Sequence, residues 1–272
     1  MIFRKTSVAF FSLGLAVLGC SSGWAGPAKL GINLNEPGHS IPPSFYGLMT
    51  EEINYSYDGG LFAELIRNRT FQDPLPGGRT RPPLGELPQH WSVVGAASAS
   101  TNEIDPVNAA LPVNLRLTLS GGEGGVANDG YWGIPVLPGA NYTATFYARG
   151  STGFAGPVTA SLVSDAGQQT VASVQTEPIS NSWKKYTVHF AVPRDATKTA
   201  QAHFVLSAKG TGNIDFSFVS LFPPTYENVP NGLRPDIMKL LAAMHPGFIR
   251  LPGGNYLEGN RFADRFAWKR MI

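Results

Sequence analysis

Two segments far apart in the chain carry polar side chains that suit the binding of a sugar. The first holds two adjacent carboxylates, Glu51 and Glu52. Neighbouring residues at a strand end point to opposite faces, so one carboxylate can enter a pocket while the other meets solvent or a basic partner. The second segment is Pro252-Gly253-Gly254-Asn255. Its glycines permit close backbone approach to a ligand, and Asn255 offers both a donor and an acceptor to hydroxyl groups.

Each segment also has a structural explanation that the residues alone leave open. Adjacent carboxylates occur on protein surfaces, and Asn255 tolerates the left-handed backbone of a turn. Arg250 could pair with a nearby carboxylate, and Tyr256 and Trp268 could either form an apolar wall for a sugar face or pack in a core. The position of both segments after predicted strands favours a role in a site, because active sites of (β/α)8 barrels lie at the C-terminal ends of strands.

The residues around Glu51 indicate the start of an α/β fold. Residues 29–36 alternate apolar and polar side chains and predict a short strand, and residues 45–50 form an apolar run typical of a buried parallel strand. After Gly59-Gly60, apolar pairs four residues apart predict a short helix over residues 61–66. A stretch rich in proline and glycine, residues 74–88, then predicts a linker.

Between residues 91 and 222 the hydrophobic period is two. Apolar and polar residues alternate over residues 113–119, 142–148, 186–192 and 202–206, with Gly and Pro between the runs. Several short alternating strands separated by turns predict an antiparallel β-sandwich.

The pattern then becomes helical. The apolar residues fall on one helix face: Leu233, Ile237, Leu240, Leu241 and Met244. Pro235 suits the first helical position and Asp236 the positive end of the helix dipole. A break at residues 245–247 and an apolar strand at residues 248–251 follow. Helix, tight turn and strand in this order are typical of an α/β barrel.

Composition excludes several classes of function. The net charge of +2 is small and scattered, which argues against nucleic acid as a partner. The five histidines show no metal-ligand spacing, and the single cysteine, Cys20, excludes an intrachain disulfide and a cysteine-based zinc site. We therefore expect no metal site.

Residues 1–25 are predicted to be a signal peptide. Arg4 and Lys5 precede an apolar run over residues 8–18, which is too short to cross a membrane. Residues 17–20 resemble a bacterial lipobox, in which Cys20 would carry a lipid and attach the protein to a membrane. Ordinary cleavage after Ala25 is the alternative. Either route exports the protein to the periplasm or the exterior.

Three motifs occur together in the chain: Gly47-x-x-x-Glu51-Glu52, Gly59-Gly60-Leu61-x-Ala63-Glu64-Leu65 and Arg250-x-Pro252-Gly253-Gly254-Asn255. Through them the chain strongly resembles the opening of the α-L-arabinofuranosidases of glycoside hydrolase family 51. The resemblance implies that Glu51 binds the arabinofuranosyl ring in the subsite next to the scissile bond, that Asn255 binds in the same subsite, and that Trp268 is the tryptophan of a following Ala-Trp-Lys stretch.

The resemblance also implies a mixed fold: an antiparallel β-sandwich, like a carbohydrate-binding module, inserted into the start of a (β/α)8 barrel that is truncated here. In this interpretation residues 29–80 hold an N-terminal strand and the first barrel strand, 90–223 the sandwich, and 226–272 the first helix and the second barrel strand. Trp132 and Trp183 of the sandwich either stack on sugars or fill its core.

Members of the resembled family are retaining enzymes with an acid/base glutamate at barrel strand four and a nucleophile at strand seven. The sequence reaches only strand two, so we assign no catalytic residue and expect the chain alone to be inactive. The resemblance implies that the complete protein would remove terminal arabinofuranosyl groups from arabinan or arabinoxylan and would need no metal or organic cofactor. Two alternatives remain: a non-catalytic carbohydrate-binding or surface-attachment protein, and a glycosidase with another sugar specificity.

Overall fold

The computed structural model describes residues 28–35, 38–74, 83–151 and 153–251, and the single residues Gly253, Arg261, Phe262, Arg265, Ala267 and Lys269. The chain divides into two compact units, Met1–Pro42 and Pro43–Ile272. The predicted signal peptide and Cys20 lie outside the described residues.

The strand expected over residues 29–36 is wrong for the residues that are described. Residues 28–35 form coil and a turn, and Leu30, Ile32 and Leu34 are exposed. Alternation predicts a strand only where a neighbouring strand completes its backbone hydrogen bonds. Residues 28–35 pair with no strand of the described chain.

Within the described residues, seven strands form one antiparallel sheet. They are β2 (Trp91–Asn102), β3 (Asn114–Asn128), β4 (Asn141–Gly150), β5 (Pro157–Ser164), β6 (Gln169–Pro178), β7 (Lys184–Ala191) and β8 (Ala202–Phe222). The order is β2-β3-β8-β4-β7, while β5 pairs with β8 on one side and β6 on the other. The four alternating runs predicted from the sequence correspond to β3, β4, β7 and β8, whereas β2, β5 and β6 were not predicted individually.

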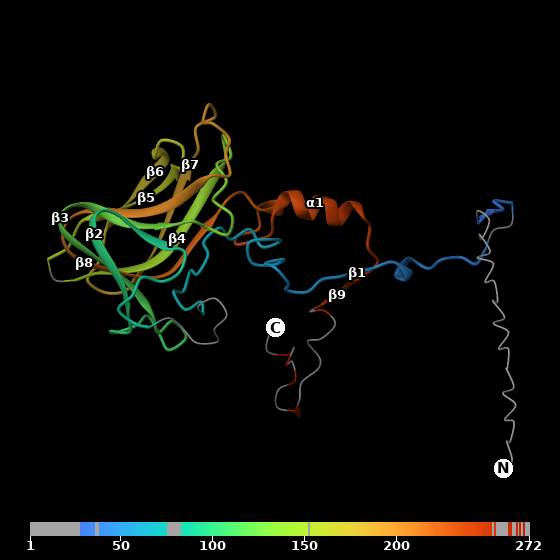
Figure 1. Cartoon of the computed structure of the whole chain (residues 1–272), viewed down its shortest axis with the longest axis horizontal. Helices are drawn as coiled ribbons and strands as arrows, with labels where there is room; N and C mark the ends of the chain where they lie inside the picture. Colours follow the sequence, from blue (N-terminus) through green and yellow to red (C-terminus); the bar gives the residue numbers. More distant parts are fainter. Residues whose placement is uncertain are drawn as a thin grey trace, which may run out of the picture. The chain divides into compact units, whose positions relative to one another are not determined.

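The 21-residue strand β8 turns this sheet into two layers (Figure 1). Its first half pairs with β5, with Phe204 opposite Leu162, and its second half pairs with β4, with Phe216 opposite Ala148. Between the halves, Gly210 and Gly212 have φ angles of 138° and 121°, which side chains disfavour. Bends at such positions let one strand serve both layers of a sandwich.

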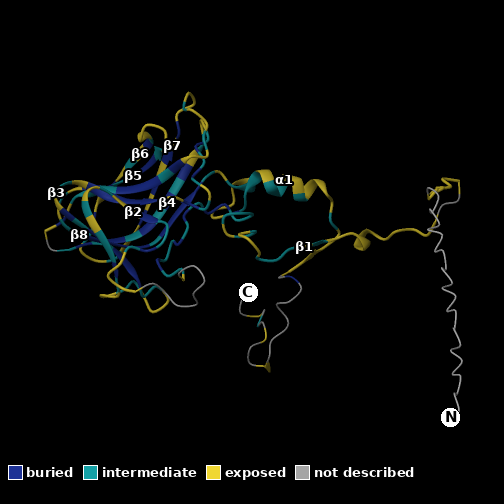
Figure 2. Ribbon diagram, in the orientation of Figure 1, coloured by how far each residue is buried: buried dark blue, intermediate teal, exposed yellow. Residues whose placement is uncertain are grey.

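The core lies between these two layers. Apolar side chains from alternating positions of β3, β4, β7 and β8 are buried there, and Figure 2 shows the buried residues gathered in these strands. The largest include Tyr142, Phe146, Phe204 and Phe216. Tyr142 donates its hydroxyl to the Pro135 carbonyl at 2.6 Å, and burial raises its pKa to about 12. A buried hydroxyl needs such a partner.

Outside the sandwich the elements are few and short. They are η1 (Pro43–Phe45), β1 (Leu48–Met49), η2 (Tyr226–Asn228), α1 (Pro235–Ala243) and β9 (Ile249–Arg250). The strands β1 and β9 pair in parallel, as expected for the segments predicted to be neighbouring barrel strands. The barrel itself stays a prediction.

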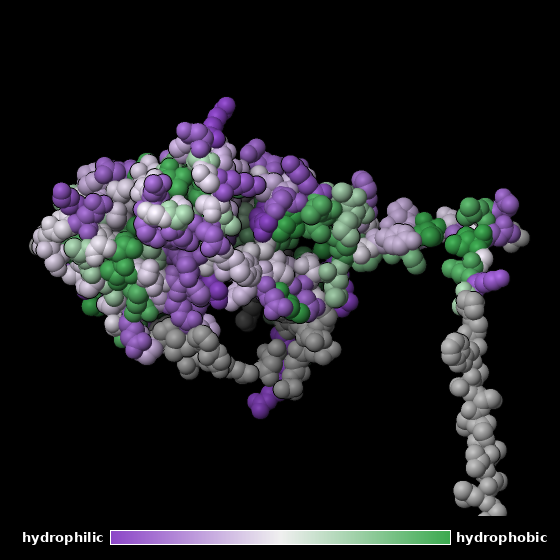
Figure 3. All heavy atoms as spheres, turned by 45° about the horizontal axis from the view of Figure 1, so that its top comes forward, coloured by the Kyte–Doolittle hydropathy of each residue, from purple (hydrophilic) through white to green (hydrophobic). Residues whose placement is uncertain are grey.

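The helix α1 forms where the apolar pattern predicted it, with Pro235 in its first turn. None of its residues is buried, and Leu240 and Met244 are 70% and 60% exposed. Figure 3 shows apolar side chains at the surface in this part of the molecule. Among the described residues, no helix has the length and apolar character needed to cross a lipid bilayer.

The helix expected over residues 61–66 is wrong. Ala63 donates its backbone N–H to the Gly232 carbonyl at 3.1 Å, and Leu65 donates to the Leu221 carbonyl at 3.0 Å. Phe62 forms isolated bridges with Asp58 and Leu233. Tertiary partners therefore take the donors that a helix would use. Leu65 and Ile66 pack with the sandwich core, and the Phe62 ring lies 5.3 Å from that of Phe222.

Candidate functional site

Glu51 lies two residues after β1, beside Gly253, which lies three residues after β9. The parallel register places Leu48 opposite Ile249 and Met49 opposite Arg250, so both strands end at one edge. Gly253 has a φ of 124°, and a Cβ at this position would clash with the Glu51 side chain. The structure thus brings the two predicted sugar-binding segments together, and the glycine makes room for the carboxylate.

The chain after Glu51 folds back on that residue. Ile53 donates its N–H to the Glu51 carbonyl at 3.1 Å, and the Ser56 hydroxyl donates to the same oxygen. Glu52 accepts the backbone N–H of Tyr57 at 2.7 Å. The two carboxylates thus differ: Glu52 binds the backbone of the loop rather than solvent or a basic partner, whereas Glu51 lies against the second segment.

Of the other predicted site residues, Asn255, Trp268 and Cys20 lie outside the described residues. The roles in binding of Glu51, Asn255 and Trp268 therefore stay predictions. In the part of the chain that the structure describes, no group of three or more His, Cys, Asp or Glu side chains could hold a metal ion.

A buried carboxylate, Glu64, joins the segment after β1 to the sandwich. Its side chain accepts the N–H groups of Ile66 and Leu221, both at 2.9 Å, and the Ser220 hydroxyl at 2.5 Å. Arg69 lies 3.4 Å from it. Burial raises the pKa of Glu64, and these hydrogen bonds and the arginine oppose that effect. Glu64, in the middle of the second motif, therefore holds the segment to the end of β8.

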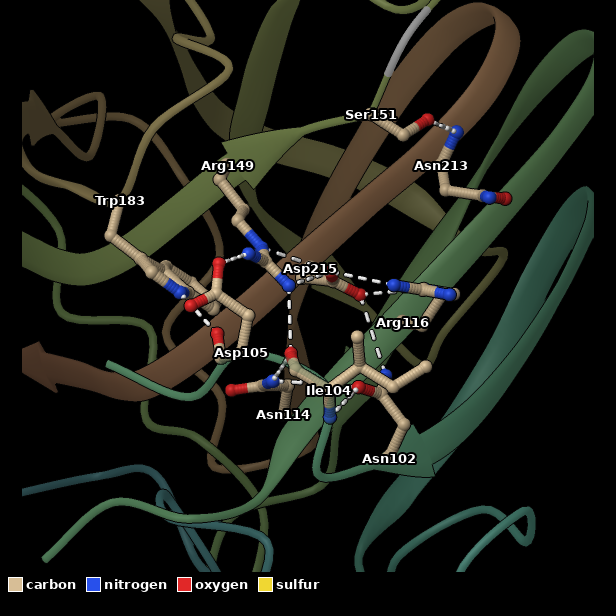
Figure 4. Close-up of polar contacts among 10 residues, drawn as sticks. All are labelled: Asn102, Ile104, Asp105, Asn114, Arg116, Arg149, Ser151, Trp183, Asn213 and Asp215. Carbon is tan, nitrogen blue, oxygen red and sulfur yellow. Dashed lines mark hydrogen bonds and ion pairs between the residues drawn. The ribbon is translucent and has the colours of Figure 1, made fainter. Parts of the chain in front are cut away.

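A second buried carboxylate, Asp215 of β8, lies between two arginines on the outer face of the sheet (Figure 4). Arg116 of β3 binds it with two bonds, from Nε at 2.7 Å and from Nη2 at 2.9 Å. Arg149 of β4 adds a bond from Nε at 3.2 Å, pairs with Asp105 and stacks on Trp183. The charges are balanced, so the cluster is suited to holding strands together rather than to chemistry.

Trp132 and Trp183, which the sequence left as either sugar-stacking or core residues, both lie outside the core. Trp132 is 63% exposed. Trp183 is half-buried under Arg149, and its indole N–H donates to the Asp105 carbonyl at 2.8 Å. Asp215 and its partners are not among the residues predicted from the sequence. The available signal was a charged residue between Ile214 and Phe216, in a strand where apolar residues dominate.

Two family models match the chain. One described as "Alpha-L-arabinofuranosidase 1 domain" matches residues 240–272, and one described as "Carbohydrate binding domain" matches residues 63–210. The second match covers more than half of the chain and contains the strands β2 to β7.

Curated relatives match nearly the whole chain. It is 33% identical over 244 residues to a "Probable alpha-L-arabinofuranosidase A" of Aspergillus flavus, covering 87% of this chain and 37% of that protein. It is 36% identical over 242 residues to an "Extracellular exo-alpha-L-arabinofuranosidase" of Streptomyces chartreusis, covering 86% of this chain and 27% of that protein. The chain therefore spans 37% of the Aspergillus relative and 27% of the Streptomyces relative.

A solved structure agrees with the sequence relatives. The arabinose-bound α-L-arabinofuranosidase MgGH51 superposes with a TM-score of 0.75 at 34% identity, over 88% of this chain and 39% of that one. The shared region includes both the sandwich and segments outside it, because the sandwich strands occupy only residues 91–222.

Proposed function

Because the chain belongs to the α-L-arabinofuranosidases of glycoside hydrolase family 51 and residues 63–210 to a carbohydrate binding domain family, we propose that the complete protein removes terminal arabinofuranosyl groups from arabinan or arabinoxylan. The observation that carries this proposal is the likeness to enzymes of that name over 87% of the chain. The contact between Glu51 and Gly253 supports it, because it joins the two motifs of one sugar pocket.

Within this proposal Glu51, Asn255 and Trp268 bind the arabinofuranosyl ring. A carboxylate accepts hydrogen bonds from hydroxyl groups, and such charged bonds are stronger than neutral ones. Asn255 can both donate and accept, and Trp268 offers an apolar face to the ring. These groups orient the sugar and do not break the bond.

Bond cleavage in the complete enzyme is assigned to two glutamates outside this chain. Retention of configuration needs a nucleophile and an acid/base with carboxyl groups about 5–5.5 Å apart. Two parallel strands do not close a barrel, so the geometry that sets this separation requires the remaining βα units. The chain covers 37% of its first curated relative, which leaves ample length for them.

Export of the protein is part of the proposal. One relative is named extracellular, and residues 1–25 have the composition of a signal peptide. Lipidation of Cys20 and cleavage after Ala25 remain two routes, and a mass measurement of the mature protein separates them.

The test compares the 272-residue chain with the product of its gene read to the stop codon, on an aryl α-L-arabinofuranoside and on arabinan. We expect the longer protein to release arabinose with retained configuration and the 272-residue chain to release none. Turnover by the shorter chain that is lost in Glu51→Gln would contradict the assignment of catalysis. Binding of arabinan without hydrolysis by the longer protein would favour the non-catalytic alternative.

A further inference from the structure

An exposed aromatic side chain of the sandwich lies near the Glu51 loop. Trp132 follows β3 and is 63% exposed. Its ring lies 5.6 Å from that of Tyr55 and 6.1 Å from that of Tyr131. Tyr55 lies in the loop that begins at Glu51. We call Tyr55, Tyr131 and Trp132 the aromatic cluster.

The backbone fixes the position of Trp132. Gly133 has a φ of 85° and donates its N–H to the Asp129 carbonyl at 3.1 Å. Ile134 donates to the Ala202 carbonyl at 2.8 Å, which ties the residues after Trp132 to β8. An exposed indole on a rigid loop loses little conformational freedom when it binds a ligand.

Contacts with neighbouring residues also fix the positions of Tyr55 and Tyr131. The Arg67 guanidinium stacks 4.6 Å above the Tyr55 ring and donates to the Tyr55 hydroxyl. Gly59 has a φ of 76°, and a Cβ there would clash with the Tyr131 ring. The first glycine of the Gly59-Gly60 motif therefore lets the loop after β1 approach the sandwich.

Two hollows meet at Trp132, each with Tyr131 and Gly133 in its wall. One, of about 540 Å³, is mainly apolar and includes Phe62, Leu65 and Pro135. The other, of about 550 Å³, is polar. Its wall carries carboxylate, amide and imidazole groups: Asp129, Asp165, Gln168, Gln201 and His203.

We propose that Trp132 and the polar hollow beside it bind the neutral pentose chain that carries the arabinofuranosyl group, next to the loop of Glu51. This inference rests on the proposed function and deepens it. Sugar rings stack their C–H faces on an indole while their hydroxyls bond to amides and carboxylates, and this hollow offers both kinds of surface. The carboxylates of Asp129 and Asp165, both partly exposed, disfavour an acidic polysaccharide.

The arrangement gives the sandwich a role in specificity. Tyr55 contacts Trp132 and lies four positions after Glu51 in the chain. A polymer held on Trp132 is thus bound beside the loop that ends the first predicted barrel strand. Substrates without a polymer chain would gain nothing from this contact.

The experiment titrates the 272-residue chain by calorimetry with a short linear arabino-oligosaccharide, a xylo-oligosaccharide and polygalacturonate. We expect one of the two neutral chains to bind and polygalacturonate not to bind. Trp132→Ala should weaken that binding by roughly tenfold or more, whereas Trp132→Phe should retain most of it. Leu240→Ala removes an equally exposed apolar side chain from α1 and should leave binding unchanged. Melting curves show that each variant is folded.

Absence of binding to both neutral chains would overturn the inference, as would equal affinity of Trp132→Ala and Leu240→Ala. Either result would leave the proposed function standing if the longer protein still hydrolyses arabinofuranosides. Conversely, Trp132-dependent binding combined with no hydrolysis by the longer protein would uphold the inference and refute the proposed function.

Discussion

The substitution Asp215→Asn tests whether the ion-pair cluster holds the sandwich together. The change keeps the shape of the side chain and removes its charge. In the parent protein the Asp215 side chain is 6% exposed and receives two bonds from Arg116 and one from Arg149. The variant would leave both arginines in place, with a neutral oxygen and an amide group that donates toward them.

The size of the effect follows from the burial of the cluster. Removing one partner of a buried ion pair costs about 3–5 kcal/mol. The side chains of Arg116 and Arg149 are 27% and 14% exposed, so water compensates part of this cost. We therefore expect a loss near the lower end, about 3 kcal/mol. For a protein of this size each kcal/mol lowers Tm by about 2–4 °C, which gives a decrease of roughly 6–12 °C.

The assay is thermal unfolding followed by circular dichroism at neutral pH, with Glu177→Gln as the matched control. Glu177 pairs with Lys184 at 2.5 Å, but both side chains are at least half exposed. Exposed pairs contribute little to stability, so this variant should melt like the parent. If Asp215→Asn and Glu177→Gln melt at the same temperature, the buried cluster does not stabilise the sheet and the reasoning is wrong.

Three further predictions follow from the same structure. In the complete enzyme, Glu51→Ala should lower kcat/KM by roughly 10- to 150-fold, because a charged hydrogen bond is worth about 1.5–3 kcal/mol. Asn255→Ala should lower kcat/KM by a smaller factor. If Glu51→Ala unfolds the protein, the residue is structural. For Glu64 the pKa is raised in the folded protein, so its contribution to stability is present at low pH and is lost as the pH rises through the folded pKa. Glu64→Gln stays neutral, so its unfolding free energy relative to the parent should increase in urea titrations as the pH rises above 4.5, the ordinary glutamate value; a constant or falling difference would contradict the direction of the shift. Residues 90–223 expressed alone should unfold cooperatively, and rapid proteolysis within the strands would show that they need the rest of the chain.

Sequence periodicity was reliable wherever local and tertiary demands coincided. The alternating residues between 91 and 222 predicted strands, because each strand has one face in the core and its backbone pairs with neighbours. The apolar face of residues 233–244 and the proline at its start also located α1, although none of the residues of this helix is buried. The motifs around Glu51 and Gly253 placed both segments together, as the structure has them.

Hydrophobic periodicity gave a wrong prediction where residues distant in the sequence accept the backbone hydrogen bonds of a segment. Residues 61–66 carry helix-like apolar pairs, yet Gly232 and Leu221 accept the N–H groups of Ala63 and Leu65. Those acceptors lie far along the chain, and a window of six residues contains no information about them.

The sequence by itself determined the period of each segment, the sandwich strands β3, β4, β7 and β8, and the family to which the motifs belong. The tertiary structure alone decided which charges meet and which aromatic residues stay outside. Arg116, Arg149 and Asp215 come from three strands, and only the register of β3, β4 and β8 sets them side by side. Trp132 meets Tyr55 because Gly59 allows the loop after β1 to reach Tyr131. Such contacts join residues that are far apart in the sequence, and the spacing of residue types along the chain does not show which distant residues meet.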